Sequence, residues 1–447
     1  MSVGTRAWAL VPGFFKENDT RLILGVMLGL YILYFLVSLG LGLGFNGTLN
    51  TLQRITFLTA VYAMLVLALN LHWGYTGLFN IGVAGFMAVG VYTMGILANA
   101  PTASPPGFGL PLPVAILGGV VAAAIVGGIA ALPALRLDAD YLAIVTVGLS
   151  EIIRFTVLST TFQNITVAGV NFGTGGGSGI NLPGNPVQAL YYNGGDVANG
   201  NTVVGDVVFG VTDALGIVPN VVLGFTYALV LLLVFVTIYY VLLVRIGNSP
   251  FGRVLKAIRE DELVASSLGK NTNRFKIKAF MVGCALMGLG GILWQGSRGF
   301  VNPTSFRPIL TFYIFTALII GGAGSNTGSV IGGAVFASLL FQGPIFAANL
   351  IQRFFQLVLG GLPSPVNFYA AAVSLNPLAW LGYSLDNIAN LRFVLLGIVL
   401  IYVMQNRSDG LLGHRKEVAA SVDLTERSGQ SGRSGGTATT DGGEVDE

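Results

Sequence analysis

The sequence contains few charged residues. Lys, Arg, Asp and Glu make up 10% of its 447 residues, against about 25% in soluble domains. Hydrophobic residues make up 53%, and the mean hydropathy is +0.75. A soluble fold of this composition would expose too much apolar surface to stay dispersed, so the composition excludes an ordinary soluble protein.

Residues typical of disulfides, metal sites and ATP sites are also scarce. The chain has one cysteine, Cys284, and two histidines, His72 and His414, which lie on different segments. No intrachain disulfide can form, and no histidine has a partner at metal-ligand spacing. The Gly-rich segment Gly321–Ser329 lacks the lysine of a phosphate-binding loop. We therefore expect no metal, no cofactor and no ATP bound by this chain, and the absence of a converging catalytic set argues against an enzyme.

Long apolar runs take up most of the chain. A transmembrane helix needs about 20 predominantly apolar residues, so each long run is a candidate span. The runs lie at about residues 22–44, 52–71, 76–98, 112–134, 141–160, 218–244, 278–296, 309–320, 328–348 and 391–405. They predict an all-α polytopic membrane protein with about ten spans. The 63 glycines suit helices that pack closely in a membrane.

The distribution of Lys and Arg predicts the orientation. Residues 161–217 contain neither, whereas basic residues are concentrated in 245–277. Cytoplasmic loops are enriched in Lys and Arg, so we expect 161–217 outside and 245–277 inside. Counting spans from these loops places residues 1–21 and the tail 406–447 in the cytoplasm, on either side of a permease domain at 22–405. The tail is rich in Ser, Gly and acids and is expected to be disordered.

Three residues near span ends need their own interpretation. Arg298 and Arg307 fall on the outer side and depart mildly from the orientation rule. His72 lies beside Trp73 at the inner end of the second span. That pairing predicts an interfacial anchor rather than a proton relay.

The segment from Phe251 to Phe280 is charged on one face and apolar on the other. Apolar residues recur at roughly helical spacing, at Leu255, Ile258, Leu263 and Leu268. Gly269 is interpreted as a helix stop. Basic residues alone would suit the anionic inner leaflet, but the acids 260–262 would be repelled there. They suit a protein partner with basic pockets.

This segment closely resembles the cytoplasmic coupling loop of LivM-type permeases of branched-chain amino acid ABC transporters. The residues that match the family pattern and carry its ATPase-coupling role are Phe251, Gly252, Arg253, Ala257, Ile258, Arg259, Glu260, Asp261, Glu262 and Gly269. Similar blocks occur at 70–97, 133–155, 299–306, 321–336 and 409–413. The resemblance spans about residues 50 to 413. It implies an ABC importer permease fold that forms the membrane path for branched-chain amino acids.

The resemblance also implies partners. They are a second, LivH-type permease, two ATP-binding subunits that use the ATP, an extracellular solute-binding protein and membrane lipid, with no nucleic acid. We expect Phe251 and Ile258 to be apolar anchors for a groove on an ATP-binding subunit. Arg253, Arg259, Glu260 and Glu262 would form the charged rim of that contact.

A second set of residues is a candidate for the translocation path: Gly77, Asn80, Gly82, Gly85, Glu151 and Arg154. Glu151 and Arg154 lie three residues apart on one helix face, and isolated charges in a membrane are costly, so we expect them to pair. The glycines allow either a broken helix, which often builds a transporter site, or close helix packing. The sequence leaves both interpretations open.

Other functions compete with this interpretation. Related permeases for urea and short amides share the same blocks. An ion-coupled secondary transporter would need intramembrane acids, and Glu151 is the one clear candidate. A passive channel would not need the acidic and basic coupling segment.

Overall fold

The computed structural model describes residues 19–134, 139–167, 169–362, 368–373, 375–406 and 410–412. Within these ranges, seven helices are long and apolar enough to cross a membrane, and three shorter apolar helices accompany them. This confirms the all-α polytopic fold. The predictions for residues 1–18 and 413–447 lie outside the described residues.

The helices of the bundle, in chain order, are α3 (Asp19–Gly40), α4 (Phe45–Asn70), η1 (Leu71–Tyr75), α5 (Val83–Ala98), α6 (Leu112–Ala134), α7 (Ala139–Leu158), α10 (Pro219–Val230), η6 (Leu231–Val236), α11 (Thr237–Asn248), α14 (Thr272–Gln295), α15 (Ile309–Gly321), α16 (Asn326–Val335), η9 (Phe336–Gln342), α17 (Gly343–Leu359) and α20 (Ile388–Asn406). Three of them, η1, η6 and η9, are π-helical and continue the preceding α-helix.

The connections contain the helices α8 (Gln188–Tyr191), α9 (Val203–Ala214), α12 (Pro250–Glu260), α13 (Glu262–Ser267), α18 (Phe368–Val373) and α19 (Pro377–Asp386). Short 3-10 turns are η2 (Thr160–Phe162), η3 (Gly176–Ser178), η4 (Asn193–Gly195), η5 (Val197–Asn199), η7 (Gly296–Arg298) and η8 (Pro303–Phe306). Strand β1 (Ile165–Val167) pairs antiparallel with β2 (Val170–Phe172), and β3 (Ile180–Asn181) pairs antiparallel with β4 (Phe300–Val301).

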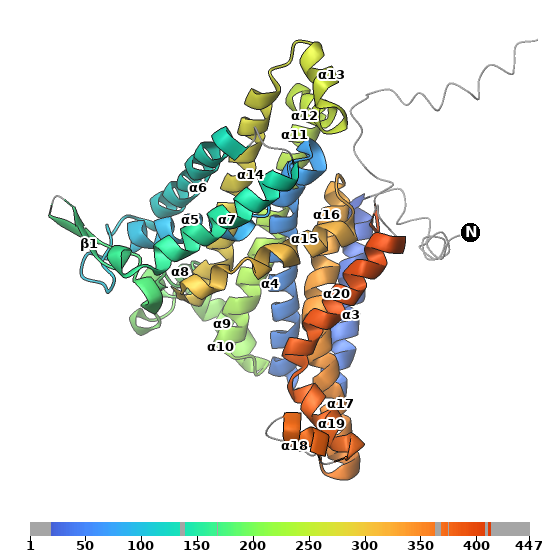
Figure 1. Cartoon of the computed structure of the whole chain (residues 1–447). Coiled ribbons are helices and arrows are strands. Elements are labelled where there is room, and N and C mark those ends of the chain that lie inside the picture. Colours follow the sequence, from blue (N-terminus) through green and yellow to red (C-terminus); the bar gives the residue numbers. More distant parts are fainter. Residues whose placement is uncertain are drawn as a thin grey trace, which may run out of the picture.

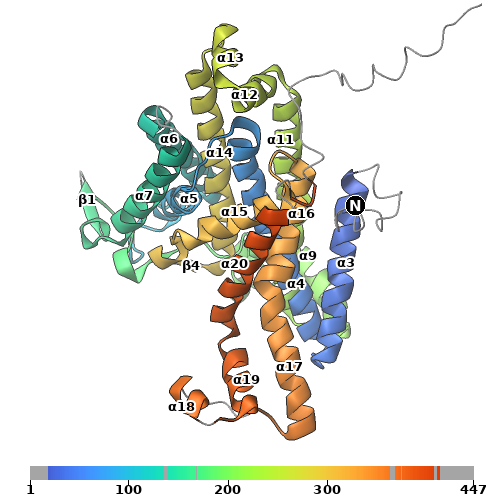
Figure 2. The same ribbon diagram turned by 45° about the vertical axis from the view of Figure 1, so that its right-hand side comes forward.

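Helix α4 forms the centre of the bundle. Its apolar window is 94% buried, against 28% for α3, α6 and α7. Figures 1 and 2 show α4 between one group formed by α5, α6, α7 and α14 and another formed by α3, α15, α16, α17 and α20. A helix buried on all sides must be apolar all round, which the sequence of α4 satisfies from Ile55 to Leu69 apart from small threonines.

Glycines bring the helices of each group into close contact. A Cβ atom at Gly90 of α5 would lie 2.7 Å from the Gly288 Cα of α14, and one at Gly333 of α16 would lie 2.7 Å from the backbone nitrogen of Ala63 in α4. Neither position tolerates a larger residue without movement. Close packing of this kind replaces the hydrophobic drive that is missing between helices in lipid.

The two ends of the bundle differ. Helices α12 and α13 project from one end, and α17 continues to α18 and α19 at the other (Figure 1). We refer to these as the α13 end and the α17 end. Residues 161–217 are folded into strands, turns and short helices. Strand β1 lies far from α13 in both views (Figures 1 and 2), and α8 lies far from α13 in Figure 1.

The structure adds detail at two places along the sequence. The run 76–98 becomes helical only at Val83, because residues 76–82 form a turn. The start of the predicted disordered tail is ordered where it is described: Leu411 and Leu412 donate backbone hydrogen bonds to the carbonyls of Ile320 and Gly321 at 2.8 and 3.1 Å. The ordered domain therefore extends beyond the predicted end at 405.

Candidate functional site

The coupling segment, residues 245–277, joins α11 to α14. Between these two helices it forms two short helices, α12 and α13, and not one. Ser249 caps α12 by accepting a hydrogen bond from the Gly252 backbone N–H at 3.2 Å. Asp261 leaves the helical conformation and caps α13 through the Val264 N–H at 3.0 Å. Aspartate is a common N-cap residue, because its carboxylate can accept a hydrogen bond from the backbone N–H three residues later. Here the Asp261 cap divides the predicted amphipathic helix into α12 and α13.

Gly269 stops helix α13, as predicted. Its φ angle is +76°, in the left-handed region that favours glycine, directly after α13. Asn271 then caps α14 through the Arg274 N–H at 3.1 Å. The chain thereby turns from α13 back into the membrane helix.

The inner face of α12 packs on the protein's own core. Leu255 is fully buried, and Ile258 is 4% exposed. The Phe251 ring stacks on Phe275 of α14 with 5.4 Å between centroids. The burial of Ile258 within this chain argues against its role as an anchor for a partner's groove, whereas Phe251 is half-buried and the prediction for it stands.

Gly252 and Ala257 support this packing. A Cβ atom at Gly252 would lie 2.1 Å from the Ile246 carbonyl oxygen, so the end of α11 and the start of α12 can approach only at a glycine. Ala257 is half-buried on the same helix, whereas Arg253 is exposed. Of these three residues, Arg253 alone remains free to meet a partner.

Three polar contacts tie the coupling segment to the bundle. Arg259 donates a hydrogen bond to the Gly74 carbonyl in η1 and lies 3.4 Å from Glu260. The buried Lys256 ammonium lies 5.4 Å from the centre of the Tyr75 ring. Glu262 pairs with Lys276 of α14 at 2.5 Å. Arg259 and Glu262 were predicted to form a rim for a partner, but both contact their own chain.

The exposed surface of the segment is apolar as well as charged. Leu263 is 80% exposed, Leu268 73% and Val264 55%, next to the exposed acids Glu260 and Asp261. Neighbouring large apolar side chains that are this exposed to solvent are a feature of contact sites. The helical spacing had placed Leu263 and Leu268 with the buried residues, and only the break at Asp261 could have separated them.

The turn at residues 76–82 connects η1 to α5 directly beneath Arg259. Gly77 has φ +71°, and a Cβ atom there would lie 3.4 Å from the Arg259 Cγ. Asn80 is fully buried, and its Oδ1 accepts from the Gly82 N–H at 2.8 Å while its Nδ2 lies 3.0 Å from His72 Nδ1. The turn is therefore a rigid, internally bonded structure.

His72 is a core residue. It is fully buried, its Nε2 lies 3.1 Å from the Phe280 carbonyl oxygen, and its ring stacks on Phe280 at 4.7 Å. The prediction of an interfacial anchor was wrong. Asn80 supplies the second polar contact that lets a histidine sit in this position without water.

Both interpretations of the glycine block describe part of the structure. The helix is broken between η1 and α5, and beyond the break α5 packs closely on α7. A Cβ atom at Gly82 would lie 2.8 Å from the Thr146 carbonyl oxygen, and one at Gly85 would lie 2.7 Å from the Ser150 Cα. The break and the close contact place residues 76–85 between the coupling segment and α7.

Glu151 and Arg154 form the predicted pair on α7. The Arg154 Nε and Nη2 atoms donate to the two Glu151 carboxylate oxygens at 2.8 and 2.6 Å, and the guanidinium lies 4.3 Å from the Phe155 ring centre. The bidentate geometry satisfies both charges. The pair lies on the helix that packs against Gly85. Among the described residues, it forms no hydrogen bond with Asn80 or Gly77.

In the described part of the chain, no group of three His, Cys, Asp or Glu side chains is placed to hold a metal ion. These elements form a physical connection: the exposed segment contacts η1 through the Arg259 hydrogen bond to Gly74 and through Lys256 on the Tyr75 ring, and it contacts α14 through the Glu262–Lys276 pair.

Similarity to known proteins covers the same region. Residues 51–404 match the family described as "Branched-chain amino acid transport system / permease component". The chain is 33% identical over 311 residues to the high-affinity branched-chain amino acid transport system permease protein LivM of Escherichia coli (strain K12), covering 69% of this chain and 66% of that protein. It is 24% identical over 393 residues to a probable LivM protein of Methanocaldococcus jannaschii, covering 82% and 94%.

A shorter match concerns a second kind of permease. Over 94 residues the chain is 36% identical to the permease protein LivH of Escherichia coli (strain K12), covering 21% of this chain and 30% of that protein. No solved structure matches the chain. From the family match over most of its length, this chain belongs to the branched-chain amino acid transport system permease family.

Proposed function

We propose that this chain is a membrane subunit of an ATP-driven importer for branched-chain amino acids and that it binds no ATP itself. One observation carries the proposal: the projecting coupling segment is joined through Arg259 to the broken helix at residues 74–82. A displacement of α12 would move the Gly74 carbonyl, which lies in the wall of the bundle. The relatives named LivM supply the class of solute.

The proposed orientation places the α13 end in the cytoplasm and the α17 end outside. It rests on the basic residues of the coupling segment and on the absence of Lys and Arg from 161–217. A cysteine at the exposed Asn199, with Cys284 replaced by alanine, tests it. We expect an impermeant thiol reagent to label intact cells, and labelling only after lysis would reverse the orientation.

The exposed face of α13 is the proposed contact with an ATP-binding subunit. Leu263 is the most exposed apolar residue of the segment, and covering its side chain with a partner would remove apolar surface from water. Leu263→Asp should therefore reduce recovery of the ATP-binding subunits with the purified permease by about tenfold, corresponding to about 1.4 kcal/mol. Val203→Asp is the matched control, because Val203 is 81% exposed on α9, far from the segment.

The complete importer would contain a second, LivH-type permease, two ATP-binding subunits and an extracellular solute-binding protein. The identity of the solute is tested on that binding protein. Isothermal titration with leucine, isoleucine, valine and urea should give tight binding of the three amino acids. Binding of urea without binding of the amino acids would mean that this chain is a permease for urea or short amides.

A further inference from the structure

Near the middle of α4, five buried polar side-chain atoms meet no hydrogen-bond partner among the described residues. They belong to four elements that are far apart in the sequence, and they are Thr59 Oγ1, Tyr62 OH, Trp294 Nε1, Gln342 Oε1 and Arg392 Nε. We call these residues the buried polar cluster. Thr59 and Tyr62 are fully buried, Gln342 is 2% exposed and Trp294 7%. Native proteins seldom leave buried polar groups unpartnered, so this concentration requires an explanation.

Aromatic rings link three members of the cluster, Tyr62, Trp294 and Arg392. The Tyr62 ring lies 5.5 Å from the Trp294 ring and 5.9 Å from the Phe341 ring. The Arg392 guanidinium lies 4.3 Å from the Phe341 ring centre. Phe336 closes another side, 5.0 Å from Tyr62. The cluster therefore combines hydrogen-bonding groups with a large apolar surface.

The local charge is positive. The charges of Arg298 and Arg392 are close enough to act on the Tyr62 hydroxyl, and the charge of Arg54 acts on Arg298. Among the described residues, no carboxylate forms an ion pair with any of these three arginines. Arg298 is also one of the residues that depart from the orientation rule. Uncompensated arginines on the outer side are explained if they attract an anionic group.

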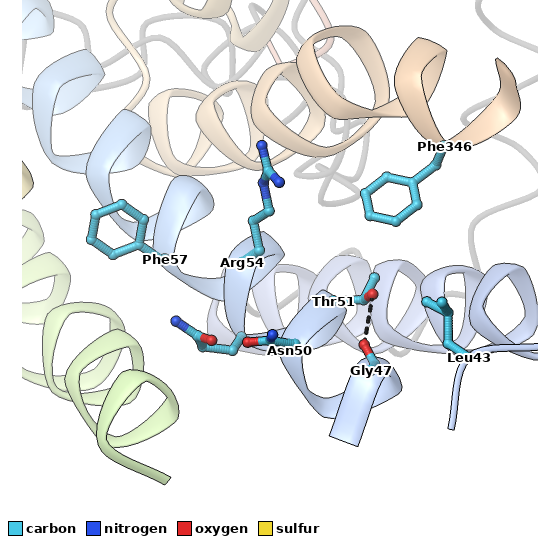
Figure 3. Close-up of a pocket in the computed structure, with 8 residues that line it drawn as sticks. Leu43, Gly47, Asn50, Thr51, Arg54, Phe57 and Phe346 are labelled. Carbon is cyan, nitrogen blue, oxygen red and sulfur yellow. Dashed lines mark hydrogen bonds between the residues drawn. The ribbon is translucent and has the colours of Figure 1, made fainter. Parts of the chain in front are cut away.

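A pocket of about 430 Å³ lies beside the first half of α4, before the cluster residues of that helix. It is lined by Leu43, Gly47, Asn50, Thr51, Gln53, Arg54, Phe57 and Phe346. Figure 3 shows the Arg54 side chain of α4 and the Phe346 ring of α17 on facing sides of this space. Arg54 lies eight residues before Tyr62, or about 12 Å along α4. Sites for small molecules commonly have a volume of about 300–1,000 Å³.

We propose that the buried polar cluster receives the solute on its way from the pocket and that it fits an apolar α-amino acid in its zwitterionic form. The Trp294 and Arg392 N–H groups and the Tyr62 hydroxyl donate to the carboxylate. The Gln342 and Thr59 side-chain oxygens accept from the ammonium group. Phe336 and Phe341 pack against the aliphatic side chain. This inference rests on the proposed function and names the residues that act on its solute.

The chemistry of the cluster separates an amino acid from an amide. Urea and short amides carry no negative group, so they would leave the arginines without a counter-charge. An amino acid supplies one anion for the donors, one cation for the acceptors and an apolar side chain for the rings. One of the five polar atoms, Gln342 Oε1, belongs to the π-helix η9, and three others belong to α4 and α14. Segments of π-helix are frequent at functional sites.

The test uses the assembled importer in proteoliposomes, with radiolabelled leucine at saturating binding protein. Tyr62→Phe and Trp294→Phe each remove one unpartnered donor and keep an aromatic ring. Losing one hydrogen bond to the solute should reduce leucine uptake by about three- to tenfold. Thermal stability of Tyr62→Phe should not fall, because no protein group loses a partner. Trp294→Phe also leaves a small cavity, so its uptake is compared at equal amounts of folded complex. ATP hydrolysis stimulated by the loaded binding protein should change less than uptake, so the leucine imported per ATP falls.

Tyr92→Phe is the matched control. Tyr92 is 3% exposed and its hydroxyl is also unpartnered among the described residues, but it lies on α5, where its ring faces Phe306. We expect wild-type uptake from this variant. Unchanged uptake in Tyr62→Phe and Trp294→Phe, or an equal loss in Tyr92→Phe, overturns the site while leaving the proposed function intact. A wild-type complex that imports urea and no leucine overturns both.

Discussion

Polar groups that are buried at the α13 end have hydrogen-bond partners, whereas those of the buried polar cluster have none among the described residues. At the α13 end, Asn70 donates to Asn326 Oδ1 at 3.1 Å and accepts from the Gly324 N–H at 2.8 Å, and Asn326 donates to the Tyr75 hydroxyl at 2.7 Å. In the buried polar cluster, Tyr62 and Trp294 have no such partner among the described residues. A satisfied network holds one arrangement rigidly, whereas an unsatisfied one requires a ligand or water to complete it.

The contrast assigns different roles to the two regions. The network around Asn70 joins α4 to α16 and lies next to Gly74, the residue that Arg259 contacts. It is therefore placed to keep the bundle closed at the α13 end and to respond when α12 moves. The buried polar cluster includes residues from the middle of α4, and we propose that it binds the solute.

The largest effect is expected from breaking the satisfied network. Asn70→Leu leaves the Gly324 N–H without its acceptor and removes the Asn70 donor from Asn326 Oδ1 in a fully buried site, which should lower the free energy of unfolding by about 2–4 kcal/mol. Thr59→Val, of nearly equal shape, removes an unpartnered hydroxyl and should change it by less than about 0.5 kcal/mol. Thermal unfolding of the purified variants in detergent measures both, and similar losses would abolish the contrast.

A smaller effect is expected from loosening the link between the coupling segment and the satisfied network. Arg259→Gln removes the charged donor to the Gly74 carbonyl while leaving the exposed face of α13 unchanged. The ATP-binding subunits should still copurify, and ATP hydrolysis stimulated by the loaded binding protein should fall about tenfold. Lys278→Gln removes an exposed charge at the same end and serves as the control. Normal stimulation in Arg259→Gln would show that force passes by another route.

The smallest effect is expected at a satisfied pair that is not fully buried. The Arg154 and Glu151 side chains are 13% and 27% exposed. A double-mutant cycle with Glu151→Gln and Arg154→Gln should give a coupling of roughly 1 kcal/mol, with the double variant milder than Arg154→Gln alone. Stability in nanodiscs is the measurement. Strict additivity would mean that the two residues act independently despite their contact.

The features visible in the sequence are those set by local periodicity. Apolar length identified the membrane helices, and the three-residue spacing of Glu151 and Arg154 identified their pair because neighbours on a helix face are fixed by the helix itself. Gly269 was identified as a helix end for the same local reason. The side of α12 that faces its own core could not be predicted, because the spacing of Leu255 and Ile258 reveals a stripe and not what covers it.

The buried polar cluster could not be found from the sequence at all. Tyr62 and Arg392 are separated by most of the chain, and nothing in the sequence indicates that they lie close together. The one available signal was the presence of arginine on the outer side, which the orientation rule marks as unusual. Only the packing of α4, α14, η9 and α20 brings these residues together.

The short segment that follows α20 has a consequence for the order in which the protein is made. The carbonyls of Ile320 and Gly321 at the end of α15 accept from Leu411 and Leu412, which lie about 90 residues later in the chain, and Leu412 also packs with Leu22 of α3. At about 5–20 residues per second, a ribosome needs roughly 5 to 20 s to make that stretch. During this interval α15 ends in carbonyls that lack their final partners, which is costly within a membrane. The contacts of α15 and α3 with this segment can therefore form only after residue 412 has been made.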